Sequence, residues 1–153
     1  MTYYTVLYDN LHQNALSLRF IFQFKENSMS KGLVFSIIES PIHPNFSNLY
    51  AELGLENVQL SSMRKALSQL KKQKPDYIVA EFFYGYGNNY AGVNISNLDV
   101  LMYSLQRYAP DARVIAMYDK SERKYLDKLL ALFSLHAVLP HPVSANALSE
   151  VLK

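Results

Sequence analysis

The sequence predicts an α/β fold in which a doubly wound, five-stranded parallel sheet is flanked by helices. Short, nearly continuous apolar runs, which are typical of parallel strands buried on both faces, alternate with segments whose apolar residues recur at helical spacing. Five such strand–helix units follow one another over about 120 residues, a pattern that favours right-handed crossovers within one sheet. The chain of 153 residues is long enough for one domain with a substantial core.

The predicted strands are short apolar segments rich in β-branched and aromatic residues. In chain order they cover residues 33–38, 57–60, 77–80, 114–118 and 137–139. Two prolines separate strands from the helices before them, because proline cannot continue a helix. Pro75 precedes the third strand and Pro110 precedes the fourth.

Each strand is followed by a segment with the signals of a helix. The first three helices open with residue types favoured at helix starts: Pro44 for the first, Ser61 or Ser62 for the second, and Ser96 with Asp99 as a capping box for the third. Gly54 suits the end of the first helix. The last two helices are expected over residues 121–135 and 143–152.

Residues 1–31 are predicted to form an N-terminal β-hairpin extension to a domain that covers residues 32–153. Apolar and polar residues alternate over residues 16–25, which indicates a strand with one apolar face. A helix over about residues 14–25 is the competing interpretation. Because an isolated hairpin is marginal in water, the apolar face is a candidate contact with the main domain or with a second copy of the chain. This face carries Phe20, Phe22 and Phe24.

The composition argues against several classes of partner. The formal net charge of +2 is too small to predict binding to nucleic acid or to an anionic membrane. The chain has no cysteine, which removes disulfides, thiolate metal sites and a cysteine nucleophile. No segment reaches the roughly 18 consecutive apolar residues of a membrane span, and the N-terminal segment lacks the pattern of a signal peptide. We therefore expect a cytoplasmic location.

The sequence predicts neither a cofactor nor a metal ion. The aromatic-, Gly- and Asn-rich segment 82–95 lacks the spacing of a dinucleotide-binding or Walker motif. His43 has no second ligand at the spacing of a metal site.

Two segments are candidates for an interaction surface, with ordinary core packing as the alternative. The segment 82–95 is rich in tyrosine, and the helix expected over 121–135 carries more apolar residues than one buried stripe needs. The candidate residues in these two segments are Tyr84, Tyr86, Tyr90, Tyr125 and Leu129.

Three motifs resemble the receiver domains of two-component response regulators. The segment 74–81, Lys-Pro-Asp-Tyr-Ile-Val-Ala-Glu, is similar to the family's PDLILLD strand, and the segment 111–118 is similar to its fourth strand with the turn before it. The sequence His141-Pro142-Val143-Ser144 is similar to the family's KPV(S/T) turn. The resemblance covers about residues 32–153. It implies a flavodoxin-like sheet of order 2-1-3-4-5 and a cis bond before Pro142.

The resemblance also implies where phosphotransfer chemistry would lie. In a receiver, an aspartate at the end of the third strand accepts the phosphoryl group, and an acidic pair after the first strand helps to hold Mg²⁺. A Thr or Ser after the fourth strand and a Lys after the fifth contact the phosphoryl oxygens. The matching positions here are Glu81 for the acceptor, Glu39 and Ser40 for the acidic pair, Tyr118 for Thr or Ser, and His141 for Lys. Val138 stands at the position of the family's switching Tyr or Phe.

Each departure weakens the expected phosphotransfer. The carboxylate of Glu81 lies one methylene further out than that of Asp, which disfavours in-line attack. The positive charge of His141 is conditional near neutral pH. Glu81 is either a built-in mimic of the phosphorylated state or a residual polar residue at a strand end. His141 is either a pH-sensitive partner of Glu81 or Glu39, or a solvated turn residue.

The sequence therefore predicts a phosphorylation-independent, receiver-like signalling module that is not an enzyme. Its expected partner is another signalling protein or, through the N-terminal hairpin, a second copy of the chain. One alternative is a ligand-binding flavodoxin-like domain that uses the crevice at the carboxyl ends of the strands. The other is a receiver that still accepts phosphate.

Overall fold

The computed structural model describes residues 31–41, 43–85 and 95–153. Residues 31–153 form one compact unit. The predicted N-terminal hairpin, with Phe20, Phe22 and Phe24, lies outside the described residues, and so do Tyr86 and Tyr90.

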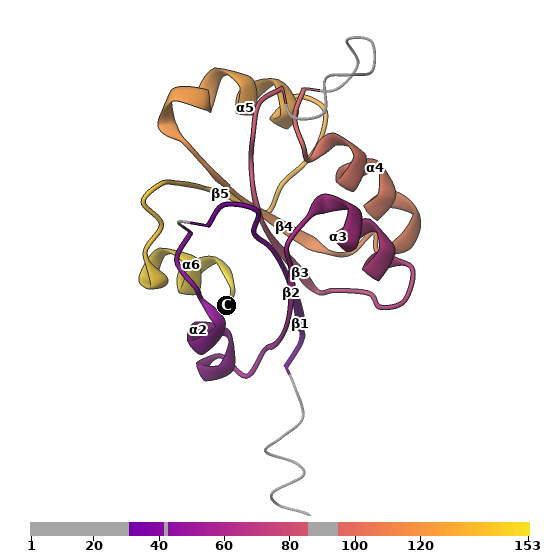
Figure 1. The fold of residues 1–153 in the computed structure, drawn as a ribbon, viewed down its shortest axis with the longest axis vertical. Coiled ribbons are helices and arrows are strands. Elements are labelled where there is room, and N and C mark those ends of the chain that lie inside the picture. Colours follow the sequence, from indigo (N-terminus) through magenta and orange to yellow (C-terminus); the bar gives the residue numbers. More distant parts are fainter. Residues whose placement is uncertain (1–30, 42, 86–94) are drawn as a thin grey trace, which may run out of the picture. The chain divides into compact units, whose positions relative to one another are not determined.

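A five-stranded sheet forms the centre of this unit (Figure 1). Its strands are β1 (Leu33–Ile37), β2 (Glu56–Leu60), β3 (Tyr77–Glu81), β4 (Arg113–Tyr118) and β5 (Ala137–Pro140). They lie in the order β2-β1-β3-β4-β5, and every neighbouring pair is parallel. The predicted fold class and strand order are therefore confirmed.

Helices cover both faces of the sheet. They are α2 (Ser47–Glu52), α3 (Met63–Leu70), α4 (Asp99–Tyr108), α5 (Arg123–Leu130) and α6 (Ala145–Val151), with a short 3₁₀ helix, η1 (Lys120–Glu122), before α5. One buried cluster joins the sheet to α3, α4 and α5, and a second joins the opposite face to α2 and α6. The carboxyl ends of all five strands consequently meet at one edge of the sheet, between the two helical layers.

Local sequence signals explain where several helices begin. The Ser62 hydroxyl accepts a hydrogen bond from the Lys65 N–H, so Ser62 is the cap expected for α3. Before α4, the Ser96 hydroxyl accepts from the Leu98 N–H, and the Asp99 carboxylate accepts from the Ser96 N–H. Only the Asp99 half of the predicted capping box is present, because the Ser96 hydroxyl accepts from Leu98 and not from Asp99, and the residue before α4, Leu98, makes no side-chain cap hydrogen bond.

The fourth predicted helix differs most from the expectation. Instead of one helix over residues 121–135, the chain forms η1 followed by α5, which ends at Leu130. Leu129 is fully buried because it lies on the inward stripe of α5 with Leu126. Its assignment to an interaction surface is therefore wrong. The side chain exposed after the helix is Leu132, at 62%.

The last helix, α6, begins at Ala145 and not at Val143, because Ser144 is its extended N-cap and its hydroxyl accepts from the Ala147 N–H. Within the described ranges, no helix is both long enough and apolar enough to cross a membrane.

Candidate functional site

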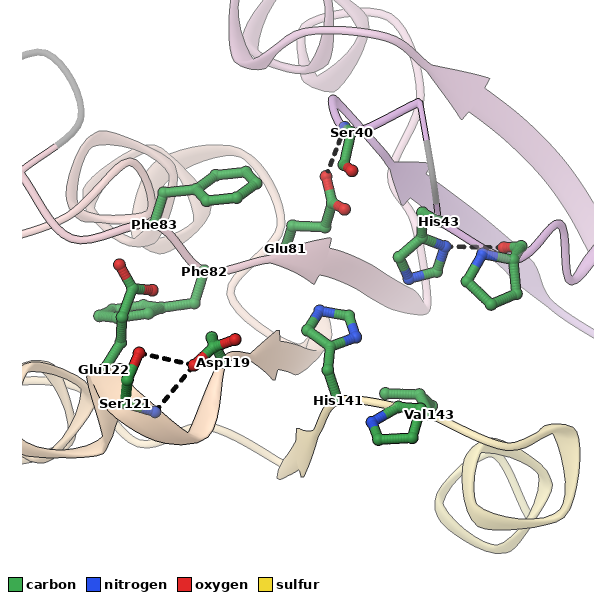
Figure 2. A pocket seen from close by; sticks show the side chains of 12 residues that line it. Ser40, His43, Glu81, Phe82, Phe83, Asp119, Ser121, Glu122, His141 and Val143 are labelled. Atoms are coloured by element: carbon green, nitrogen blue, oxygen red, sulfur yellow. Dashed lines mark hydrogen bonds between the residues drawn. The ribbon is translucent and has the colours of Figure 1, made fainter.

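A cavity of about 670 Å³ lies at the carboxyl ends of the strands (Figure 2). Its lining combines carboxylates, imidazoles and apolar side chains: Ser40, His43, Pro44, Glu81, Phe82, Phe83, Asp119, Ser121, Glu122, His141, Pro142 and Val143. Three of the predicted positions, Ser40, Glu81 and His141, are thereby brought together. Glu39, Tyr118 and Val138 do not line it.

Glu81 is the last residue of β3, and its side chain ties that strand to the loop after β1. One carboxylate oxygen, Oε2, accepts hydrogen bonds from the backbone N–H of Glu39 at 2.8 Å and of Ser40 at 2.9 Å. The residue is only 3% exposed, so the carboxylate is held by protein donors in place of most of its water. Glu81 is thus a structural anchor at the position that resembles the acceptor.

The carboxylate of Glu39, in the same loop, also accepts a hydrogen bond from a backbone N–H group. Its Oε1 accepts from the N–H of Met63, the first residue of α3, at 2.8 Å. An acidic group at a helix N-terminus satisfies an otherwise unpaired amide and is favoured by the helix dipole. The one acid left of the expected acidic pair therefore caps a helix.

Tyr118 ends β4 but turns its hydroxyl toward α5. The phenol oxygen accepts from the Arg123 guanidinium at 3.2 Å, and the guanidinium carbon lies 5.7 Å from the centre of the Tyr118 ring. The hydroxyl that a receiver would direct at a phosphoryl group is consequently used in a contact outside the cavity.

Asp119, the next residue, takes part in a local turn at the cavity rim. Its carboxylate accepts from both the hydroxyl and the N–H of Ser121, at 2.6 and 2.8 Å. These hydrogen bonds stabilise the ionised form and lower the pKa of the Asp119 carboxyl. The carboxylate therefore stays negatively charged at neutral pH.

Two histidines lie beside each other at one side of the cavity (Figure 2). The rings of His43 and His141 have centroids 5.7 Å apart and meet edge to face at 77°. Burial lowers the pKa of His43 from its usual 6.5, and the neighbouring His141 acts in the same direction. The hydrogen bond with Pro44 and the charge of Glu81 act against this shift.

Asn97 fixes the segment that leaves β3. This buried side chain donates to the Glu81 carbonyl at 2.7 Å and accepts from the Phe83 N–H at 2.8 Å. The Asn97 N–H donates to the Phe83 carbonyl in turn, at 3.2 Å. The Asn97 side chain thus supplies the hydrogen-bond partners that these backbone groups of Glu81 and Phe83 would otherwise find in a neighbouring strand.

Tyr84 and Tyr125, both predicted as surface residues, lie against each other. Their rings stack with centroids 3.4 Å apart and planes 11° from parallel. The ammonium groups of Lys124 and Lys128 lie 4.8 and 5.6 Å from the centre of the Tyr125 ring. Because Tyr84 is 46% exposed, the pair forms an aromatic and basic surface beside the cavity.

Several lining residues were not predicted from the sequence. His43 was noted only as an unsupported metal ligand, and Phe83, Asp119 and Glu122 were not singled out. The signal that could have found Phe83 and Asp119 is their place immediately after a strand, because parallel strands bring the segments that follow them to one edge. The cis bond before Pro142, implied by the resemblance, is confirmed.

The described residues contain no group of three or more His, Asp or Glu side chains placed to hold a metal ion. One carboxylate oxygen of Glu81 and one of Glu39 already accept backbone N–H groups, which leaves these two acids fewer oxygens for a Mg²⁺ ion.

Comparisons with solved structures place the fold among receiver domains. A response regulator receiver domain protein from Clostridium thermocellum is 18% identical with a TM-score of 0.62, over 78% of this chain and 90% of that one. The REC domain of AraT, a response regulator from Geobacillus stearothermophilus, is 16% identical with a TM-score of 0.61, over 79% and 89%. The Vibrio cholerae chemotaxis protein CheY4 is 15% identical with a TM-score of 0.60, over 78% and 94%.

The sequence matches no protein-family model and no curated protein. The structural similarities, all at low identity, show that residues 31–153 share the fold of response-regulator receiver domains. A fold alone does not determine what the site does, so function has to be argued from the residues.

Proposed function

We propose that this chain is a phosphorylation-independent, receiver-like signalling module that acts by binding another protein. The observation that carries the proposal is the carboxylate of Glu81, which accepts two backbone hydrogen bonds at the position where a receiver's acceptor would stand. With Oε2 accepting from two amides, the carboxylate is fixed in the orientation that holds the loop, which disfavours in-line attack on a phosphoryl donor.

The charges around the cavity support this proposal. Among the described residues, the lining includes the carboxylates Glu81, Asp119 and Glu122 and neither Lys nor Arg. Phosphoryl transfer needs positive charge near the transferring oxygens, which this lining does not supply. Binding of a dianionic phosphoryl group beside these carboxylates would be repulsive.

The proposed interaction surface is formed by the stacked rings of Tyr84 and Tyr125. Tyrosines with lysines over their rings offer apolar area together with positive charge, a composition suited to a protein partner. In this proposal the partner is another signalling protein, the location is cytoplasmic, and no enzymatic activity is involved.

Incubation with acetyl phosphate and Mg²⁺, followed by intact-mass measurement, tests phosphorylation independence. We expect no phosphoryl adduct on the native chain. Glu81→Asp is the matched variant, and it too should stay unmodified, because an aspartate there still lacks the cationic partner and the acidic pair. A working receiver domain treated in parallel controls for the donor. A stable adduct on the native chain would show that it is instead a receiver that accepts phosphate.

The predicted homodimer through residues 1–28 has its own test. We expect the full chain to have the solution mass of a dimer and a chain without residues 1–28 to have that of a monomer. The double variant Phe20→Ser and Phe22→Ser, which keeps the chain length, should also be monomeric. A monomer before and after deletion would exclude this contact.

A second candidate is a ligand-binding domain, and the cavity itself favours it. Its volume of about 670 Å³ lies in the range of ligand sites, roughly 300–1,000 Å³. Saturable binding of riboflavin, a flavin without a phosphate group, abolished by a bulky substitution such as Ser40→Trp, would favour this function over protein binding alone.

A further inference from the structure

Each of the three carboxylates that line the cavity is held in place through one of its two oxygens. Oε2 of Glu81 accepts from two backbone amides in the loop after β1. Oδ1 of Asp119 accepts from the N–H and the hydroxyl of Ser121. Oε1 of Glu122 accepts from the N–H of Tyr84 at 3.2 Å. These hydrogen bonds fix three negative groups around one space.

The second oxygen of each carboxylate has no hydrogen-bond partner among the described residues. In the same part of the chain, no Lys or Arg forms an ion pair with Glu81, Asp119 or Glu122. Because Glu81 is 97% removed from solvent, at 3% exposure, little water is available to replace the missing partner. The cavity therefore offers acceptor oxygens and negative charge that the protein itself does not neutralise with Lys or Arg.

Aromatic side chains lie beside these oxygens. Phe82 and Phe83 directly follow Glu81 in sequence, and both line the cavity. Figure 2 shows the Phe83 ring extending toward Glu81. The face of an aromatic ring attracts cations, and a planar guanidinium group can also stack on it. Carboxylate oxygens beside an aromatic ring thus form a suitable environment for an organic cation.

We propose that this cavity binds a guanidinium group, carried by a free small molecule or by an arginine side chain of a partner. A guanidinium is planar, keeps its charge at neutral pH and has five N–H donors in a fixed arrangement. It can therefore donate to several carboxylate oxygens while one face lies on an aromatic ring. This inference rests on ligand binding in the cavity, the second candidate function, and not on phosphorylation independence.

The lining disfavours other classes of ligand. An anion would meet three carboxylates and, among the described lining residues, neither Lys nor Arg. A metal ion needs ligands that converge on one point, and the described ranges contain no group of three or more His, Asp or Glu side chains placed in that way. An organic cation does not need such convergence, because its donors are spread over several atoms. The volume of about 670 Å³ also suits a small organic ligand.

Titration of the full-length chain with Nα-acetyl-arginine amide, followed by NMR of the backbone amides, tests the proposal. We expect saturable shifts at Ser40 and Phe83, which line the cavity on different segments. Nα-acetyl-citrulline amide, in which a neutral urea replaces the guanidinium, is the matched ligand. It should bind about tenfold more weakly, because its hydrogen bonds to carboxylates lose their positive charge.

Two substitutions remove charge from the cavity but keep the oxygens that accept the local hydrogen bonds. The double variant Asp119→Asn and Glu122→Gln should weaken binding of the arginine amide by about tenfold or more. The double variant Asp111→Asn and Glu52→Gln makes the same change in net charge at exposed positions away from the lining, and should leave binding nearly unchanged.

Two further probes distinguish the sources of the guanidinium. Tighter binding of agmatine than of a short glycine-flanked arginine peptide supports a free small molecule, and the reverse supports a partner's arginine. The proposal is overturned if the arginine amide gives no saturable shift, if the citrulline amide binds as tightly, or if the cavity double variant binds as tightly as the native chain. Binding of riboflavin without binding of any guanidinium probe would overturn this inference alone and leave the ligand-binding function in place.

Discussion

Two regions beside the cavity, here called the β3 wall (Glu81 and Asn97) and the α5 wall (Arg123 and Asp127), are built in different ways. Of these four residues, only Glu81 lines the cavity itself. On the β3 wall, Glu81 and Asn97 are 3% and 6% exposed, and each makes short hydrogen bonds to backbone groups. On the α5 wall, the ion pair between Arg123 and Asp127 has side chains 52% and 54% exposed. Both walls are polar, yet only the first buries its polar groups.

The difference indicates which polar contacts contribute most to the stability of the fold around the cavity. A buried donor that loses its partner costs free energy because water does not replace it, whereas an exposed ion pair competes with water and contributes little. The position that resembles the phosphoryl acceptor therefore belongs to the β3 wall, whose polar contacts are buried and contribute more to stability. The α5 wall should be held by its apolar inner face, with its polar contacts contributing little.

The largest expected effect tests the apolar face of α5. Leu129→Ala removes a fully buried side chain and should lower the free energy of unfolding by about 2–5 kcal/mol. Leu132→Ala, a change of the same type at an exposed position, should stay within about 0.5 kcal/mol. Urea unfolding measures both. Equal costs for the two variants would contradict the buried placement of Leu129.

Removing the Glu81 carboxylate should have the next largest effect. Glu81→Ala leaves the N–H groups of Glu39 and Ser40 without their acceptor and should cost about 3 kcal/mol of unfolding free energy. Glu81→Gln keeps an acceptor oxygen at the same reach and should cost about 1 kcal/mol. Glu52→Ala, at an exposed position of α2, is the control and should change little. A Glu81→Ala variant as stable as the Glu52→Ala control would contradict the anchor role.

A substitution at Asn97 provides a second test of the β3 wall, with an uncharged side chain in place of a carboxylate. Asn97→Ala loses one donated and one accepted hydrogen bond and should cost about 2 kcal/mol in urea unfolding. Asn48→Ala, at an exposed position of α2, should stay within about 0.5 kcal/mol. If both asparagine variants unfold at the same urea concentration, the segment after β3 is held by something other than this side chain.

The smallest expected effect is on the exposed wall. Arg123→Ala removes the contacts with Asp127 and Tyr118 and should leave the urea midpoint of unfolding almost unchanged, because the guanidinium is exposed to water. That small change should shrink further at high salt, because exposed charges are screened. A cost as large as that of Glu81→Ala would abolish the distinction between the walls.

Sequence patterns predicted the sheet well because burial on both faces leaves continuous apolar runs. The strand at 77–80 and its neighbours were found for that reason, and Ser62 was found as a cap because its residue type is favoured there. Leu129 was misplaced because a helix with apolar residues on many sides does not reveal which stripe faces the core.

Residues of the site were predicted only where they match functional positions of the receiver family. It located Glu81 and His141 but gave no direction for side chains, so the turn of Tyr118 toward Arg123 was not foreseen. The proximity of His43 to Met117 joins residues 74 positions apart in sequence, and no local pattern reports such a contact.

The central claim is that the acceptor-like position is a structural anchor that phosphoryl donors do not alter. Amide hydrogen exchange of Glu39 and Ser40, followed by NMR with and without acetyl phosphate and Mg²⁺, tests it most directly. Both amides should exchange slowly in the native chain, unchanged by the donor, and rapidly in Glu81→Ala. Loss of protection on adding acetyl phosphate and Mg²⁺ to the native chain, together with a phosphoryl adduct, would contradict the account.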